Sequence, residues 1–368
     1  MRCRSGDPRR GCPWPWSNGK KAGGQWPGSP RRGPYVLKIT SVPAAAFFLS
    51  LIHSERGIRD RKRSLPKTAR LFAKEKITHI LKRLVVLSVP ISLASIMLPI
   101  VSNLDLLIVP RRLEVAGYAT AQATELFGYL TGMSVPLINL ATILTAAMAM
   151  SLVPAISHSF TLDDSAAIYD RTAGAVRIAL LVTIPFSVML YVLAEPVVTF
   201  IYNAPAATDA TRAIAVAICF LGMHQITTAI LQGLKKPKIP VINMIIACVV
   251  KVLCNWFLVA IPAFGISGAS YATVADIGVA AGLNLIFIYK YTNYIPDLKS
   301  IVRNVVIAGF MGAVMYGLYA LIAPYFGLFL RLTVTTLTGS AVYIALMGLS
   351  GGLTKEDVRK VPGVGRFF

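Results

Sequence analysis

Lys251 and Asp276 lie in the middle of two neighbouring apolar runs, each long enough to cross a membrane. A charge at the bilayer centre costs about 2.5–3.5 kcal/mol on insertion scales, so such residues usually mark a function. Lys251 lies ten residues before Ile261 and Asp276 ten residues after Ile266, which is about 15 Å of helix in each case. A short turn joins the two runs, so we expect Lys251 and Asp276 to lie at similar depth and to pair if their helix faces match. The pair is either a static structural clamp or a titrating or substrate-contacting site that lines a wet cavity.

Three further charged residues lie near the outer end of the first apolar run: Asp105, Arg111 and Arg112. Charges close to a membrane interface can simply reach water, which is one interpretation of all three. The alternative is that Asp105 lines the pathway and that the paired arginines bind a phosphate, because guanidinium forks match phosphate geometry.

Uncharged polar residues and glycines within the runs are assigned to helix packing. The polar patch of the fourth run comprises His224, Gln225 and Gln232, and hydrogen bonding between helices is the favoured use. Gly265, Gly268 and Gly282 are interpreted as glycines that let neighbouring helices approach.

Enzyme motifs are missing from the sequence. It has no HExxH, GxSxG or Walker motif, and no GxGxxG that opens a helix after a strand. We therefore expect no catalytic residues, no cofactor and no metal site, and transport driven by ions or gradients rather than by an ATP motor within the chain.

The composition indicates an all-α integral membrane protein. Of the 368 residues, 55% are hydrophobic and 14% are charged, whereas a soluble globular chain carries about 25% charged residues. Apolar runs recur from Leu84 onward, and runs of about 20 residues suit a bilayer. The sequence predicts about eight transmembrane helices, at residues 84–109, 126–156, 173–201, 212–234, 239–261, 266–289, 301–323 and 326–349.

The formal net charge of +21 comes mainly from the N-terminal part of the chain. Residues 1–83 hold 20 Lys and Arg against 4 Asp and Glu, and the rest holds 17 against 12. A basic segment beside a membrane domain favours anionic lipid as partner rather than nucleic acid. The expected organisation is a basic, Gly/Pro-rich segment that is disordered or artefactual (1–54), a basic amphipathic linker (55–83), a transmembrane domain (84–349) and a cytoplasmic tail (350–368).

The distribution of basic residues between the loops predicts the orientation. Lys and Arg gather before the first run, after the fourth and after the last, and the opposite loops hold few. By the positive-inside rule both ends of the membrane domain are cytoplasmic. An even number of spans agrees with this orientation.

Several segments resemble one transporter family in their order and spacing. They are LSVPISLASIMLPIVSNLDLLIVPRRL (87–113), LTGMSVPLINLATILTAAMAMSLVPAIS (130–157), LAEPVV (193–198), ILQGLKKPKIPVINMIIACVVKV (230–252) and GISGASYATV (265–274). Together they resemble the polysaccharide-transporter branch of the multidrug/oligosaccharidyl-lipid/polysaccharide (MOP) flippase superfamily, of the stage V sporulation protein B type. The resemblance covers the second six-helix lobe and two C-terminal helices.

The resemblance implies a flippase of the bacterial cell membrane whose substrate is an undecaprenyl-pyrophosphate-linked sugar, such as the peptidoglycan precursor lipid II. Lys251 and the outer arginines would then meet the pyrophosphate, and Asp276 would neutralise Lys251 between strokes. One lobe also suggests a homodimer in which two copies enclose a cavity. The alternatives are a cation-coupled multidrug exporter of the same superfamily, with Asp276 or Asp105 binding the cation, and a membrane scaffold that transports nothing.

Overall fold

The structure, a computed structural model, describes residue 96 and residues 99–352. These residues belong to one compact unit of the chain, Lys76–Phe368. The predicted segments 1–54 and 55–83 lie outside the described residues. The same holds for residues 84–95, 97 and 98 of the first predicted span and for residues 353–368 of the predicted tail.

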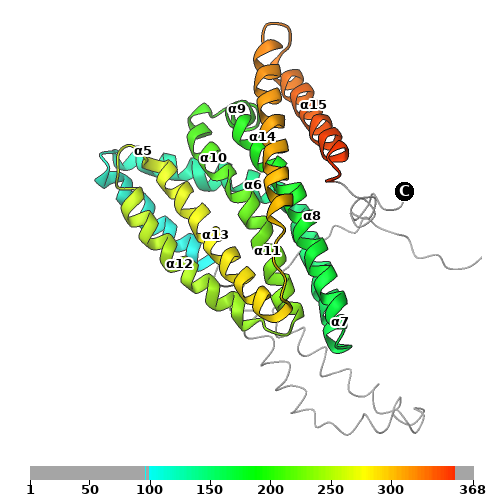
Figure 1. Ribbon diagram of the computed structural model, residues 1–368. Helices are drawn as coiled ribbons and strands as arrows, with labels where there is room; N and C mark the ends of the chain where they lie inside the picture. The colour runs from blue at the N-terminus through cyan, green and yellow to red at the C-terminus, as the bar shows by residue number, and fades with distance from the viewer. Residues whose placement is uncertain (1–95, 97–98, 353–368) are drawn as a thin grey trace, which may run out of the picture. The chain divides into compact units, whose positions relative to one another are not determined.

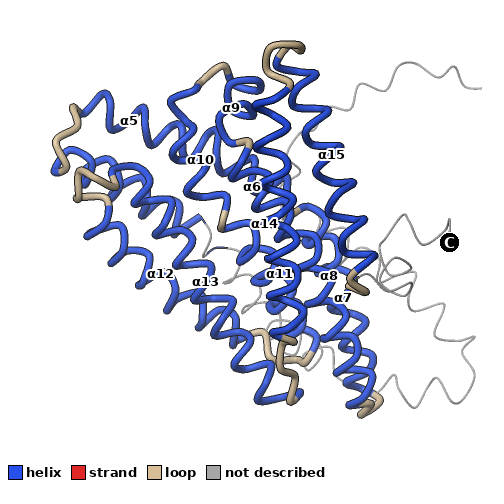
Figure 2. The backbone as a smooth tube through the Cα atoms, turned by 45° about the horizontal axis from the view of Figure 1, so that its top comes forward, coloured by secondary structure: helices blue, strands red, loops and turns tan. Residues whose placement is uncertain are grey.

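Every regular element in the described part of the chain is a helix (Figure 2). A first helix covers residues 99–115. The others are α5 (Thr120–Gly128), the π-helix η2 (Tyr129–Ser134), α6 (Val135–Ala141), α7 (Ile143–Thr161), α8 (Ser165–Val192), α9 (Ala194–Tyr202), the 3₁₀-helix η3 (Pro205–Ala207), α10 (Thr208–Ala215), α11 (Ala217–Gly233), α12 (Lys238–Leu258), α13 (Gly265–Thr292), α14 (Leu298–Leu321) and α15 (Leu328–Leu349).

The predicted all-α membrane fold class is confirmed. Within residues 99–352, six helices are long and apolar enough to cross a membrane: α7, α8, α12, α13, α14 and α15. The segments Pro205–Ala215 and Ala217–Gly233 form a seventh candidate if they are taken as one span bent by 47°. Each of these seven matches one predicted span, and the first predicted span, 84–109, is described only in part.

Two predicted spans are interrupted for local reasons. In the structure, the predicted span 173–201 is broken at Leu193 and forms the two helices α8 and α9. Pro196 has no N–H, so the carbonyl of Val192 lacks its helical partner there, and a new helix begins instead. The prediction at 126–156 was placed too early: the span-length helix is α7, and residues before Thr142 form the shorter elements α5, η2 and α6.

Helix α11 organises the packing of the unit. It lies against α7, α8 and α13, while α12 packs on the far side of α13 and α14 packs on α8. Figure 1 shows α12 and α13 side by side and antiparallel, with α14 and α15 as a second hairpin on the other side. The buried apolar side chains that hold α8, α11 and α14 together include Ile230, Leu180 and Met311.

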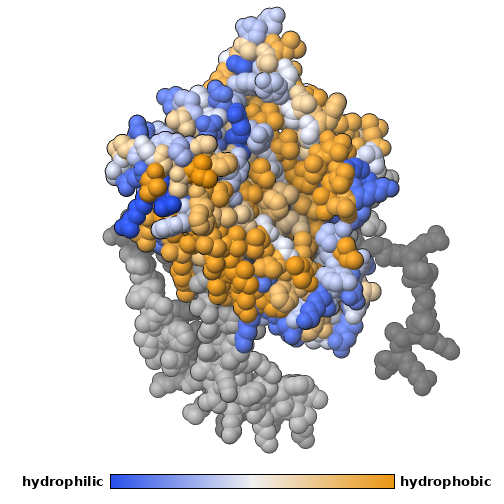
Figure 3. Space-filling view, turned by 60° about the vertical axis from the view of Figure 1, so that its left-hand side comes forward, coloured by the Kyte–Doolittle hydropathy of each residue, from blue (hydrophilic) through white to orange (hydrophobic). Residues whose placement is uncertain are grey.

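The outward faces of the helices are apolar, as lipid contact requires. On α12 the exposed side chains include Ile242, Ile246, Val249 and Leu253. Figure 3 brings forward the side on which α12 lies in Figure 1 and shows a broad, largely hydrophobic surface. Because soluble proteins seldom expose such large apolar patches, this surface supports insertion in a bilayer.

The three glycines assigned to helix packing do not behave alike. A Cβ added to Gly268 would lie 2.9 Å from the backbone carbonyl carbon and oxygen of Leu258, so α12 and α13 approach there only because residue 268 has no side chain. Gly265 adopts φ +46° and lies against the Tyr118 side chain. The packing interpretation is wrong for Gly282, where an added Cβ would meet nothing within 4 Å.

We predict that Gly268→Ala destabilises the protein, because the obstacle is backbone and cannot rotate away. Overpacking of this kind costs about 1–3 kcal/mol. Gly282→Ala, on the same helix, is the matched control and should leave stability unchanged or raise it slightly. The measurement is the free energy of unfolding in mixed micelles. Equal effects of the two substitutions would contradict the close approach of α12 and α13.

Candidate functional site

One face of α12 carries polar and small side chains that point into the unit. Asn243, Ala247, Lys251 and Asn255 follow one another at four-residue steps and all are buried. Four-residue steps keep side chains on one face of a helix. The polar face of α12 therefore turns away from lipid and toward its neighbouring helices.

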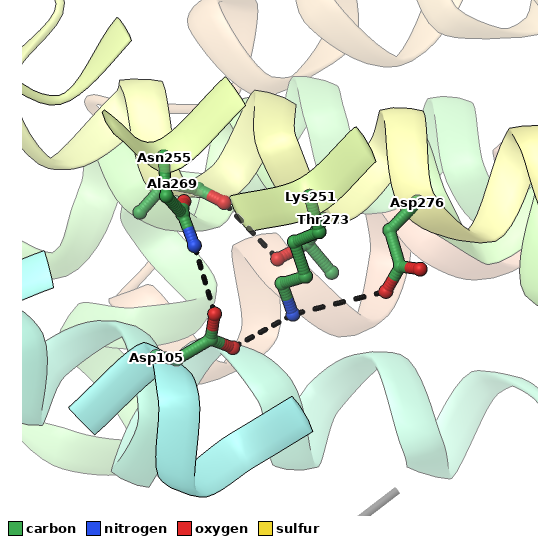
Figure 4. A network of polar contacts seen from close by, with 6 residues as sticks. All are labelled: Asp105, Lys251, Asn255, Ala269, Thr273 and Asp276. Carbon is green, nitrogen blue, oxygen red and sulfur yellow. Dashed lines mark hydrogen bonds and ion pairs between the residues drawn. The ribbon is translucent and has the colours of Figure 1, made fainter. Parts of the chain in front are cut away.

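Lys251 lies between two carboxylates that come from different helices. Its Nζ is 2.7 Å from Oδ2 of Asp105, in the helix of residues 99–115, and 3.9 Å from Oδ2 of Asp276, in α13 (Figure 4). Asn255, one turn further along α12, donates from Nδ2 to Oδ1 of Asp105 at 2.8 Å. The predicted meeting of Lys251 and Asp276 is present, and the shorter contact is the one to Asp105.

Burial makes this cluster energetically sensitive. Lys251 is 6% exposed and Asp276 is 8% exposed. Removing ions from water costs several kcal/mol each, and mutual attraction repays it only when the geometry is good. The ammonium of Lys251 neutralises one of its two partners, so the cluster carries one excess negative charge when all three groups are ionised.

The cluster lines a cavity of about 430 Å³. Other lining residues include Val101, Phe127, Asn139, His224 and Thr273. The Thr273 hydroxyl donates to the Ala269 carbonyl at 3.0 Å, so it follows the backbone of α13 (Figure 4). The charged side chains of the lining are Asp105, Lys251 and Asp276. The cavity is thus mostly apolar, with its charges concentrated at one place.

The structure does not bring Arg111 and Arg112 to this cluster. Arg112 donates from Nε to the carbonyl of Trp256 at 2.9 Å, and its guanidinium lies 4.3 Å from the centre of that indole ring. Arg111 is exposed. Arg112, in the helix of residues 99–115, therefore contacts α12 near the end of α12 rather than at the middle of the span.

The sequence interpretation missed one member of the cluster, Asn255, and left two alternatives open for Asp105. One interpretation of Asp105 was that its carboxylate reaches water at a membrane interface. That interpretation is wrong, because the Asp105 side chain is partly buried against Lys251. Asn255 was not singled out. The spacing of Asn243, Lys251 and Asn255 could have identified one polar face of α12, although no spacing shows which helix faces it.

A second polar contact links α12 and α13 further from the cluster. Asn243 donates from Nδ2 to Oδ1 of Asn284 at 2.8 Å, and Asn284 donates to the hydroxyl of Thr228 on α11 at 3.1 Å. Gln225 accepts from Thr145 of α7 at 2.6 Å, so for Gln225 the predicted hydrogen bonding between helices is present.

Comparison with known proteins identifies relatives of one kind. The family profile described as Lipid II flippase MurJ matches residues 133–336. Stage V sporulation protein B of Bacillus subtilis (strain 168) is 25% identical over 265 residues, which cover 71% of this chain and 51% of the relative. The Uncharacterized membrane protein YabM of the same organism is 27% identical over 289 residues, which cover 76% of this chain and 53% of the relative. Lipid II flippase MurJ of that organism is 24% identical over 260 residues, which cover 66% of this chain and 47% of the relative. The chain spans about half the length of these curated relatives.

The geometry of the cluster predicts a ranking of substitutions by stability. Lys251→Met leaves two carboxylates without their ammonium, and breaking a buried pair in this way costs about 3–5 kcal/mol. Asp105→Asn removes the 2.7 Å contact and should cost more than Asp276→Asn, which removes the 3.9 Å contact. The measurement is the free energy of unfolding of each variant in mixed micelles.

Two controls make the ranking specific. Lys238→Met replaces an exposed lysine at the start of α12 and should have little effect. Combining Asp105→Asn with Lys251→Met should recover part of the loss, since it removes one of the uncompensated charges. A larger cost for Asp276→Asn than for Asp105→Asn would contradict the pairing described here.

Proposed function

Because the chain belongs to the family of the lipid II flippase MurJ, we propose that it takes part in moving a lipid-linked oligosaccharide across the bacterial cell membrane. The proposed substrate is of the peptidoglycan-precursor type, a sugar carried on undecaprenyl pyrophosphate. Two of the relatives named above, Stage V sporulation protein B and Lipid II flippase MurJ, support a role in cell-wall or spore-envelope formation.

The observation that carries this proposal is the buried ammonium of Lys251 at the wall of a cavity inside the membrane-spanning unit. A cation at this depth is costly unless it is paired, and intramembrane charges commonly mark substrate or ion paths. A pyrophosphate is the part of the proposed substrate that is hardest to move through hydrocarbon, because it carries charge. Lys251 is placed where such a charge would need a partner.

In the proposed cycle the pyrophosphate competes with Asp276 for Lys251. The 3.9 Å contact to Asp276 is the longer of the two and is the one to be exchanged, while Asp105, bound also by Asn255, keeps Lys251 in position. When the substrate leaves, Asp276 returns to its contact with the ammonium. Arg111 and Arg112, which follow Asp105 in the helix of residues 99–115, would attract the phosphates on the outer side.

A second candidate function is favoured by the charge of the cluster. Two carboxylates share one ammonium, so the ionised cluster has a net charge of one negative unit. A bound proton or Na⁺ would neutralise this charge and so stabilise the cluster. Such a cation would couple transport to an ion gradient, as in the exporters of the same superfamily. This candidate predicts that transport follows the gradient and does not require a pyrophosphate on the cargo.

The test is translocation in proteoliposomes that contain the full chain. The cargo is a fluorescent undecaprenyl-pyrophosphate disaccharide, and its arrival in the opposite leaflet is followed by quenching from outside. We expect transfer faster than in empty liposomes, and a loss of about tenfold or more for Lys251→Met, which equals at least about 1.4 kcal/mol of lost stabilisation. Lys238→Met is the matched control and should transfer as the unmodified chain does.

Three outcomes decide between the functions. If the chain moves the labelled lipid no faster than empty liposomes, or if Lys251→Met moves it normally, the flippase proposal fails. If a cationic dye is moved instead, in response to a pH or Na⁺ gradient, the exporter candidate replaces it.

A further inference from the structure

A second cavity adjoins the one that holds the charged cluster. It has a volume of about 630 Å³ and lies between α7, α11 and α12. Asn139, Leu221, His224 and Met244 line both cavities, so the two meet at these side chains. The charged cluster and the second cavity are therefore neighbours, with these four side chains between the two spaces.

The lining of the second cavity combines apolar side chains with a few polar ones, and it contains no Asp, Glu, Lys or Arg. Along α11 it presents His224, Thr228 and Gln232, which lie one helical turn apart from each other. Asn139 faces them from α6, and apolar residues such as Val153 and Met150 of α7 complete the wall. Uncharged hydrogen-bonding groups set among apolar ones suit hydroxyl and amide groups, which is the composition expected of a sugar site.

The hydrogen bonds of this row leave capacity for a ligand. Thr228 accepts from Asn284 Nδ2 at 3.1 Å, which leaves its own hydroxyl proton free to be directed elsewhere. Within the part of the chain that the structure describes, Nδ1 of His224 is buried and has no hydrogen-bond partner. A buried polar group without a partner is uncommon, so the imidazole has hydrogen-bonding capacity that its described neighbours do not use.

We propose that His224, Thr228 and Gln232 form a neutral subsite that binds the sugar of the cargo, next to the charged cluster that meets its pyrophosphate. This inference rests on the proposed function and assigns the pyrophosphate of the cargo to the first cavity and its sugar to the second. The subsite gives selectivity for a glycosylated carrier over a bare one, because its hydrogen bonds form only with the sugar. His224, at the boundary of the two cavities, is placed to contact the first sugar.

The test measures binding rather than transport, with the full chain in lipid nanodiscs and two probes. One probe is undecaprenyl pyrophosphate with a disaccharide attached, and the other is undecaprenyl pyrophosphate alone. We expect tighter binding of the first. His224→Phe or Gln232→Leu should weaken it roughly 2- to 10-fold, as the loss of one neutral hydrogen bond implies, and leave the second probe unaffected.

Matched variants separate hydrogen bonding from shape. His224→Asn keeps polar groups near Nδ1 and should restore part of the binding lost in His224→Phe. Phe220→Leu lies one turn earlier on α11, outside both cavity linings, and should change neither probe. Each variant is first checked for an unchanged elution profile and melting temperature.

The outcomes distinguish failure of this inference from failure of the proposed function on which it rests. If both probes bind equally well and His224→Phe changes neither, the sugar subsite is overturned and the pyrophosphate function stands. If neither probe binds, the proposed function fails and this inference fails with it. If the variants weaken both probes alike, His224 and Gln232 act on the shape of the cavity and no sugar subsite exists.

Discussion

The position of Lys251 is the constraint on which the described unit depends. An ammonium inside a membrane protein must be paired, and here its partners come from two further helices, Asp105 in residues 99–115 and Asp276 in α13. Three segments far apart in the sequence therefore have to meet at one depth. The close approach of α12 and α13 at Gly268 brings the polar face of α12 into reach of Asp276. Hydrophobic burial alone would not specify this arrangement, because lipid tails are as apolar as the helix faces.

The acidic residues and the lysine of the two cavities lie in one cluster. The charged cluster lies in the first cavity, and the polar side chains of the adjoining cavity carry hydroxyl, amide and imidazole groups among apolar neighbours. A lipid-linked sugar has the same division, with charge on the pyrophosphate and neutral polar groups on the sugar. In the proposed function, hydrogen bonds to these side chains would replace bonds that the cargo makes with water, which lowers the cost of desolvation.

Much of the architecture could be predicted because membrane helices leave a strong signal. About 20 apolar residues are needed per span, and the predicted spans at 239–261, 266–289, 301–323 and 326–349 correspond to α12, α13, α14 and α15. The resemblance of several segments to the flippase superfamily agreed with the family profile that matches the chain. The break at Leu193 and the early elements before Thr142 were missed. At Leu193 the cause is the missing N–H of Pro196, which affects a single backbone bond and is not detected by hydropathy averaged over a span.

The sequence by itself determined that the chain is a helical membrane protein and that Lys251 and Asp276 lie at similar depth, since both follow from hydropathy and helical rise. Only the tertiary structure decided that Asp105 is the nearer partner of Lys251, that Arg112 packs on Trp256 instead, and that His224 lies where two cavities meet. The reason is physical. Depth along a helix is a local quantity, whereas the face that a helix turns toward a distant segment results from the packing of all its neighbours.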